Sequence, residues 1–155
     1  MRLTRFSDYS LRVLIYLGLR EGQLVTIRSI SDAYGISRNH LMKVVSLLTR
    51  LEYLRAQRGP GGGIRLARDP ADINLAQVIR DTEEDLNMVE CFSPDGKCVI
   101  SPVCRLQFVI HAALDAFMAT MESHTLEDLL HPAANLSGLL NMRQDVSAAS
   151  ERALK

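Results

Sequence analysis

Two helical patterns separated by a tight turn are the feature that most constrains the fold of this chain. Thr26 precedes the pattern IRSISDAY, and Gly35 follows it. Ser37 then precedes a second pattern, which runs from Arg38 to about Leu51. Thr and Ser cap helix starts, and Gly favours helix ends. The sequence therefore predicts a helix-turn-helix.

The second helix of this pair has two faces of different chemistry. Its apolar positions recur at helical spacing and comprise Leu41, Val44, Val45, Leu48 and Leu51. The opposite face carries Asn39, Lys43, Ser46 and Arg50. Amide and cationic groups of this kind read base edges and phosphates when such a helix enters a major groove. An ordinary amphipathic surface helix would have the same face, and His40, near the apolar boundary, is predicted to pack.

A glycine-rich hairpin follows and favours DNA binding. YLRAQ and IRLA are predicted as short strands around RGPGGG, with Arg58, Arg65 and Arg68 beside the glycines. Glycines allow close approach to a surface, so the hairpin is predicted to be a DNA-contacting wing. The glycines are not predicted to bind a nucleotide phosphate, because neither GxxxxGK(S/T) nor GxGxxG is present. The predicted DNA contacts are Thr26, Arg28, Ser37, Arg38, Asn39, Lys43, Ser46, Arg50, Arg58, Gly61, Gly62, Gly63 and Arg65.

The remaining helical patterns complete a mainly α fold. Ser7 is predicted to cap a helix over DYSLRVLIYLGLR, and Asn74 one over LAQVIRDTEEDL. A long helical seam after Pro102 comprises Leu106, Val109, Ile110, Ala113, Phe117 and Met121. So long a seam predicts pairing with a second copy, as a homodimer. The predicted organisation is a winged helix-turn-helix domain with a two-stranded wing (1–70), a loop with a dimerisation helix (71–140) and a disordered tail (141–155).

Charge is divided unevenly along the chain. Residues 1–68 hold twelve Lys or Arg and four Asp or Glu, a balance of +8, although the net charge of the chain is zero. A basic half joined to an acidic half indicates a polyanion-binding module followed by a regulatory module. The N-terminus has no apolar signal core and no 18-residue apolar run occurs, so we expect a cytoplasmic protein with no membrane contact.

The cysteines are confined to one loop. Cys91, Cys98 and Cys104 are the only three, with six and five residues between them. An odd number cannot all form disulfides within one chain, and the spacing is not that of a CxxC site. Pro94 and Gly96 indicate a surface turn rather than a core. In a reducing compartment these thiols are predicted to bind metal, the alternative being three unrelated buried thiols.

With these motifs in order, the chain resembles bacterial winged-helix regulators that carry an iron–sulfur cluster. The resemblance rests on LTRFSDYSLRVLIYL, ISRNHLMKVVSLL, RGPGGGIRLARDP and the three-cysteine loop, and it covers residues 1 to about 140. Within that family it is similar to repressors that sense nitric oxide and control nitrosative-stress genes. The resemblance implies a four-iron four-sulfur cluster, with a two-iron two-sulfur cluster as the alternative, and a double-stranded DNA operator.

The resemblance also bears on the cluster's ligands. Cys91, Cys98 and Cys104 are the implied thiolates. Relatives that sense cluster-assembly demand have a histidine where this chain has Gln107, so that ligand is excluded. Asp8 occupies the position from which the partner subunit can supply the fourth ligand. Its alternative role is a helix-start carboxylate that pairs with Arg12; His111 is a weaker candidate, expected to be remote from the loop.

Other functions are compatible with parts of the sequence. A cluster-sensing regulator of iron–sulfur biogenesis or iron homeostasis would have the same architecture. A thiol-redox repressor could instead form a disulfide between Cys91 and Cys98. No nucleophile–base arrangement or pair of catalytic carboxylates stands out, so we do not expect an enzyme.

Overall fold

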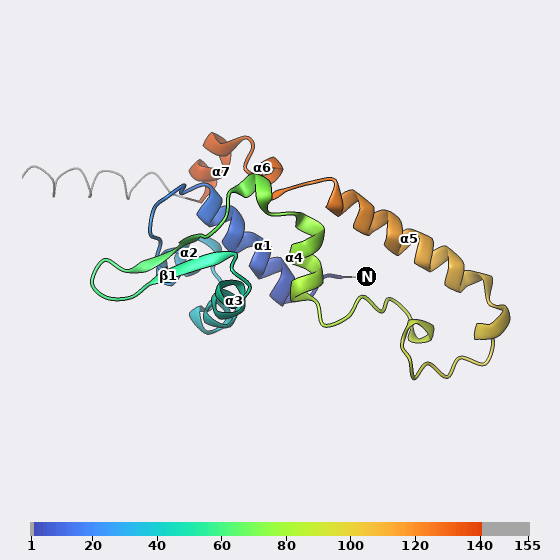
Figure 1. The fold of residues 1–155 in the computed structure, drawn as a ribbon. Coiled ribbons are helices and arrows are strands. Elements are labelled where there is room, and N and C mark those ends of the chain that lie inside the picture. The colour runs from blue at the N-terminus through green and yellow to red at the C-terminus, as the bar shows by residue number, and fades with distance from the viewer. Residues whose placement is uncertain (1, 141–155) are drawn as a thin grey trace, which may run out of the picture.

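A computed structural model describes residues 2–140 of the chain (Figure 1). Its helices are α1 (Arg5–Gly18), α2 (Ile27–Tyr34), α3 (Arg38–Arg50), α4 (Leu75–Thr82), α5 (Arg105–Glu122), α6 (Leu126–Leu129) and α7 (Ala133–Leu139), and its strands are β1 (Leu54–Gln57) and β2 (Gly63–Leu66). The mainly α class and the winged helix-turn-helix are therefore confirmed. The predicted tail, 141–155, lies outside the described residues.

The N-cap of helix α1 lies three residues before the predicted cap, Ser7. Thr4 is the N-cap, and its hydroxyl accepts a hydrogen bond from the Ser7 amide. Ser7 lies inside the first turn and is fully buried, where its hydroxyl accepts a hydrogen bond from Thr82. The prediction that Ser7 caps the helix was wrong because residues 4 and 7 both suit a cap, and only contact with α4 distinguishes them.

The helix-turn-helix follows the predicted caps. The Thr26 hydroxyl caps α2, Gly35 ends it with a φ of 66°, and the Ser37 hydroxyl caps α3. The predicted apolar face of α3 is buried at Leu41, Val44, Val45 and Leu48. These side chains pack with α1 and α2 around one hydrophobic core.

The wing is an antiparallel hairpin that is joined to the start of α2. Leu54 pairs with Leu66, and Gln57 pairs with Gly63. Val25, just before α2, forms an additional bridge with Ile64 through hydrogen bonds of 2.8 and 2.9 Å. This bridge fixes the base of the hairpin relative to the helix-turn-helix, and the hairpin tip extends away from the helices (Figure 1).

Helix α4 is shorter than its sequence pattern suggested. The Asn74 side chain caps it as predicted, but it ends at Thr82 rather than near Leu86. Carboxylates at a helix C-terminus oppose the helix dipole, and three acidic residues follow Thr82. Glu83 is extended and turns its side chain to α1 instead.

The seam of α5 is divided between two surroundings. Met118, Phe117 and Met121 pack on Ala76 and Ile79 of α4. Leu106 and Val109, at the other end of the helix, are exposed. The expectation that the whole seam faces a second copy is therefore corrected: its C-terminal half covers the chain's own α4.

The core also crosses the predicted domain boundary at residue 70. Ile73 and Val78 belong to the same buried cluster as the helix-turn-helix, as does Leu126 of α6. The sequence patterns did not predict α6 or α7. Among residues 2–140, no helix is long and apolar enough to cross a membrane.

Candidate nucleic-acid interface and cysteine loop

The outward face of α3 gathers the predicted base-reading groups. Its exposed polar and charged residues are Arg38, Asn39, His40, Lys43, Ser46 and Arg50. His40 differs from the expectation that it packs, although its ring lies 6.1 Å from that of Tyr9. Asn39, Lys43, Ser46 and Arg50 line a shallow depression of about 660 Å³ together with Met42 and Leu47. The face therefore offers amide, ammonium, hydroxyl and guanidinium groups along one helix.

Three predicted contacts beside this face already have partners within the chain. The hydroxyls of Thr26 and Ser37 accept from the amides of Ser29 and His40, at 3.1 and 3.4 Å. Arg28 lies 3.7 Å from Asp32 in an exposed i, i+4 pair. Such a pair contributes little stability, so Arg28 remains available to a phosphate.

The wing glycines have a structural reason within the protein itself. A Cβ on Gly63 would lie 2.7 Å from the Val25 carbonyl oxygen, and one on Gly62 would lie 2.8 Å from the Gly59 carbonyl oxygen. Gly61 has a φ of 75°, which favours glycine. The glycines thus allow the hairpin to turn and to bridge the start of α2, while their contact with DNA stays a prediction.

The wing arginines divide into two groups. Arg58 and Arg65 are exposed beside the hairpin tip and on β2. Arg68 instead donates hydrogen bonds of 2.9 and 3.1 Å to the carbonyl oxygens of Leu51 and Glu52. Its guanidinium also lies 4.7 Å from the centre of the Tyr53 ring. Arg68 therefore holds the base of the wing, whereas Arg58 and Arg65 extend into solvent.

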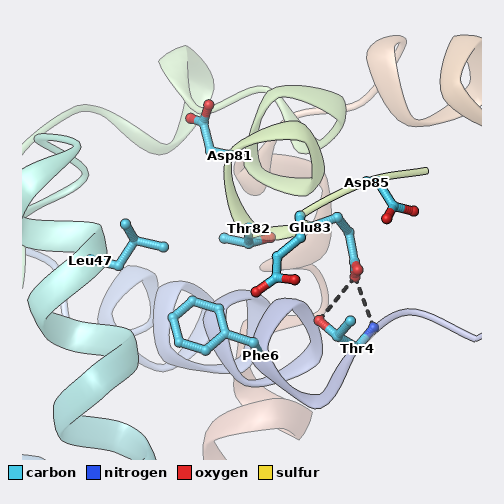
Figure 2. Close-up of a pocket in the computed structure, with 8 residues that line it drawn as sticks. Thr4, Phe6, Leu47, Asp81, Thr82, Glu83 and Asp85 are labelled. Atoms are coloured by element: carbon cyan, nitrogen blue, oxygen red, sulfur yellow. Dashed lines mark hydrogen bonds between the residues drawn. The ribbon is translucent and has the colours of Figure 1, made fainter. Parts of the chain in front are cut away.

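The end of α4 is anchored to α1 and to the base of the wing by three consecutive residues. Asp81 accepts a 2.6 Å hydrogen bond from the Tyr53 hydroxyl, and Thr82 donates a 2.9 Å hydrogen bond to the Ser7 hydroxyl. Glu83 accepts from the Thr4 amide and hydroxyl, at 2.8 and 3.1 Å (Figure 2). One turn of chain therefore contacts the base of the wing, the body of α1 and the start of α1.

An open cavity of about 590 Å³ lies at this junction (Figure 2). It is lined by Thr4, Phe6, Leu47, Asp81, Thr82, Glu83, Glu84 and Asp85. Burial, reinforced by the hydrogen bond to Asp81, raises the pKa of Tyr53 above its ordinary value. Tyr53 thus stays a protonated donor to Asp81 throughout the neutral range.

The cysteine loop starts directly after α4 and ends at α5, on the side of the molecule away from the wing (Figure 1). Cys91, Cys98 and Cys104 are free and half-buried. In the part of the chain that the structure describes, no three His, Cys, Asp or Glu side chains are gathered closely enough to hold a metal. The loop therefore supplies three free, half-buried thiols, while their approach to a common metal stays a prediction.

Asp8 and His111 differ in how they relate to this loop. Asp8 forms a two-pronged pair with Arg12, in which both nitrogen–oxygen distances are 3.0 Å. The helix-start pairing is therefore present within one chain.

His111 was expected to be remote from the loop, but its ring stacks on Phe92 with centroids 3.8 Å apart. The expected remoteness was wrong because α5 runs back along the loop that precedes it.

The N-terminal half of α5 and the adjoining loop expose apolar side chains. Leu106, Phe108 and Val109 are 61%, 75% and 64% exposed, and Val99 and Val103 of the loop are 91% and 83% exposed. Several exposed apolar side chains in one segment are typical of an interaction site.

Sequence reasoning missed two groups that the structure brings forward. The Tyr53–Asp81 hydrogen bond joins residues 28 positions apart, so no local pattern could reveal it. Met42 lies within the predicted recognition helix and is half exposed. Its position between Leu41 and Lys43 could have identified it, since an apolar residue off the buried stripe requires a separate explanation.

Comparison with known proteins places the chain among transcriptional regulators. It is 49% identical to the HTH-type transcriptional regulator NsrR of Bacillus subtilis (strain 168) over 146 residues, which cover 93% of this chain and 100% of the relative. It is 47% identical to the protein of the same name from Geobacillus kaustophilus (strain HTA426), with 93% and 99% coverage.

Solved structures agree on the fold. T. potens IscR superimposes with a TM-score of 0.69 at 23% identity, covering 86% of this chain and 88% of that one. CymR, the global cysteine regulator of B. subtilis, superimposes with a TM-score of 0.66 at 25% identity, covering 83% of this chain and 95% of that one. The model of the Rrf2 family, described as iron-dependent transcriptional regulators, matches residues 3–132. With its helix-turn-helix, wing and cysteine loop in the matched region, this chain belongs to the Rrf2 family of transcriptional regulators.

Proposed function

We propose that this protein is an NsrR-type repressor that binds a double-stranded DNA operator as a homodimer and senses nitric oxide through an iron–sulfur cluster. The observation that carries the proposal is the position of the thiols. All three lie on the loop that directly follows the end of α4, where the chain is hydrogen-bonded to α1 and to the base of the wing. The similarity to the two NsrR relatives described above supports the same proposal.

For DNA, we propose that α3 enters the major groove and that the wing contacts the adjacent backbone or minor groove. Asn39 and Lys43, in the first two turns of α3, are exposed and able to reach base edges. Arg58 and Arg65 extend from the hairpin and are exposed to solvent, so they are suited to phosphate contacts. The balance of +8 over residues 1–68 supports binding to a polyanion.

For the cluster, we propose Cys91, Cys98 and Cys104 as thiolate ligands. Their chemistry fits, because iron–sulfur clusters are held mainly by thiolates and all three thiols are free and half-buried. The four-iron form is proposed over the two-iron form on the resemblance to the relatives. A bound cluster supplies iron that reacts with nitric oxide, most readily where a weaker oxygen ligand completes the set. Reduced thiols require a reducing compartment, so we propose a cytoplasmic location.

Asp8 of the partner subunit is proposed as the oxygen ligand. Within one chain its carboxylate is held by Arg12 with side chains more than 40% exposed on both residues. An exposed i, i+4 pair of this kind contributes only about 0.3–0.5 kcal/mol. Asp8 can therefore leave Arg12 for a stronger ligand bond at little expense to the stability of α1.

The homodimer is proposed on the apolar surface of α5. Leu106, Phe108 and Val109 are largely exposed among the residues that the structure describes, although they lie on one helix. A second copy would bury them and would place two α3 helices on a symmetric operator.

The end of α4 offers a route between loop and DNA. Asp81, Thr82 and Glu83 fix the first residues of the loop segment to Tyr53, Ser7 and Thr4. A change of loop conformation on cluster loss would therefore act on α1 and on the base of the wing. To switch the protein from mostly DNA-bound to mostly free, the free-energy difference between the two states must change by about 5.5 kcal/mol.

Anaerobic purification, a visible spectrum and counts of iron and sulfide test this proposal. Each of Cys91→Ala, Cys98→Ala and Cys104→Ala should lose the brown colour and bind the operator more weakly. Ser93→Ala, in the same loop, is the matched control and should keep both properties. A cysteine variant without colour but with unchanged operator affinity would contradict the coupling. A colourless wild type whose affinity follows thiol oxidation would point to a thiol-redox repressor.

A further inference from the structure

Met42 is the one large hydrophobic side chain exposed anywhere in residues 2–82, at 50%. The other exposed large hydrophobic side chains lie at Met88 or beyond, in the loop segment, α5 and α7. The DNA-binding part of the molecule thus covers its apolar residues except at this position.

The surroundings of Met42 are polar and basic. It follows Asn39 by three residues, adjoins Lys43 and precedes Ser46 by four, so all four lie on one face of α3. Together they line the shallow depression described above. Met42 is therefore an apolar spot on the flank of the face proposed to enter the major groove, beside Asn39 and Ser46.

The chemistry of the groove restricts what such a spot can contact. Base edges in the major groove present hydrogen-bond donors and acceptors, and the one apolar group among them is the 5-methyl group of thymine. A thioether chain that covers a donor or acceptor leaves that group without a partner, which is unfavourable. Against a thymine methyl, the same chain buries two apolar surfaces at once.

We propose that Met42 is a specificity-determining residue that recognises the methyl group of a thymine in each half-site of the operator. This inference rests on the proposed function, since it requires α3 to lie in the major groove. It assigns to Met42 a preference that Asn39 and Lys43 do not supply, because they read hydrogen-bonding groups.

Uracil substitution tests the inference, since it removes one methyl group and leaves the base-pairing edge unchanged. The probe is a duplex enriched from a randomised pool by the cluster-loaded wild-type protein, in which each thymine is replaced in turn by uracil. At one thymine in each half-site, wild-type affinity should fall about four-fold, the effect expected for one buried methyl group. Met42→Ala should bind the thymine duplex more weakly and should show no loss with uracil at that position.

Met88→Ala is the matched control. Met88 is 37% exposed and lies outside α3, so this variant should keep the full uracil effect. Lys43→Ala should bind the duplex more weakly overall but should also keep the full uracil effect. If Met42→Ala retains the uracil effect, or if no thymine matters to the wild type, the inference is wrong. A wild type that enriches no duplex would overturn the proposed DNA binding, and this inference with it.

Discussion

The hydroxyl of Tyr53 donates a 2.6 Å hydrogen bond to Oδ2 of Asp81, across 28 residues of sequence. Tyr53 is 1% exposed and begins the wing, whereas Asp81 lies in the last turn of α4. The contact therefore joins the base of the wing to the helix that precedes the cysteine loop. The other oxygen of Asp81 accepts from Gln77 at 2.8 Å, which fixes the carboxylate.

Removing this hydrogen bond should destabilise the protein. Tyr53→Phe leaves the Asp81 carboxylate without its donor while keeping the ring that packs in the core. The free energy of unfolding should fall by roughly 1.5–3 kcal/mol, as for a hydrogen bond to a charged group. Urea denaturation measures the change. Gln77→Ala, which removes only the exposed partner of Asp81, should change stability by less than about 0.5 kcal/mol, and an equal effect of both variants would contradict the assignment.

Tyr53 should also make stability fall at alkaline pH. Its pKa is raised in the folded protein, because burial and Asp81 disfavour the phenolate. Above about pH 10, the unfolded chain loses this proton while the folded protein keeps it, so the contribution of Tyr53 to stability is present below pH 10 and is lost as the pH rises further. The difference in unfolding free energy between pH 9 and 11 should be smaller in Tyr53→Phe than in the wild type. Identical pH profiles would exclude this role.

Gly63 should not tolerate a side chain. In Gly63→Ala, the new Cβ would lie 2.7 Å from the Val25 carbonyl oxygen, in the bridge that fixes the wing. We expect a loss of about 1–3 kcal/mol of stability from this overpacking, together with weaker operator binding. Gly138→Ala is the matched control, because its Cβ would meet nothing within 4 Å. Alanine also suits α7, so that variant should be as stable as the wild type or slightly more stable.

Lys43 and Arg58 should differ in what they contribute to DNA binding. If Lys43 contacts a base, Lys43→Ala should cost about 1–3 kcal/mol and relax specificity at one position. Arg58→Ala should weaken binding to all sequences and reduce the salt dependence, as loss of one phosphate contact does. Binding measured at several salt concentrations on operator and random duplexes separates these outcomes. Arg80→Ala, which removes a cation on α4, should alter neither; unchanged binding in both test variants would contradict the interface.

Substitution of Asp8 tests whether this residue is a cluster ligand or only a helix-start carboxylate. As a partner of Arg12 alone, its loss should cost only about 0.2–0.5 kcal/mol and leave the visible spectrum unchanged. As the fourth ligand, its loss in Asp8→Ala should shift the spectrum, alter reactivity toward nitric oxide and weaken operator binding. Because the ligand is proposed to come from the partner, a heterodimer of Cys98→Ala and Asp8→Ala subunits should regain one complete site. A heterodimer that binds no cluster would indicate ligands from a single chain.

The sequence by itself determined the local elements of this protein. Thr26, Gly35 and Ser37 defined the bounds of the helix-turn-helix, because caps and left-handed glycines act through neighbouring backbone groups. The 3.6-residue period likewise separated the buried face of α3 from its exposed face. These features depend on residues within one or two turns of each other, so they can be read directly.

Only the tertiary structure decided the contacts between distant segments. Ser7 had the right chemistry for a cap, but its buried hydroxyl accepts a hydrogen bond from Thr82. Thr4 caps α1 instead. The seam of α5 had one period along its length, yet only the half near Met118 finds α4 to cover it. In both cases the local sequence patterns were equivalent, and the contacts made in the folded protein decided between them. Burial and hydrogen bonding depend on the partner as much as on the residue.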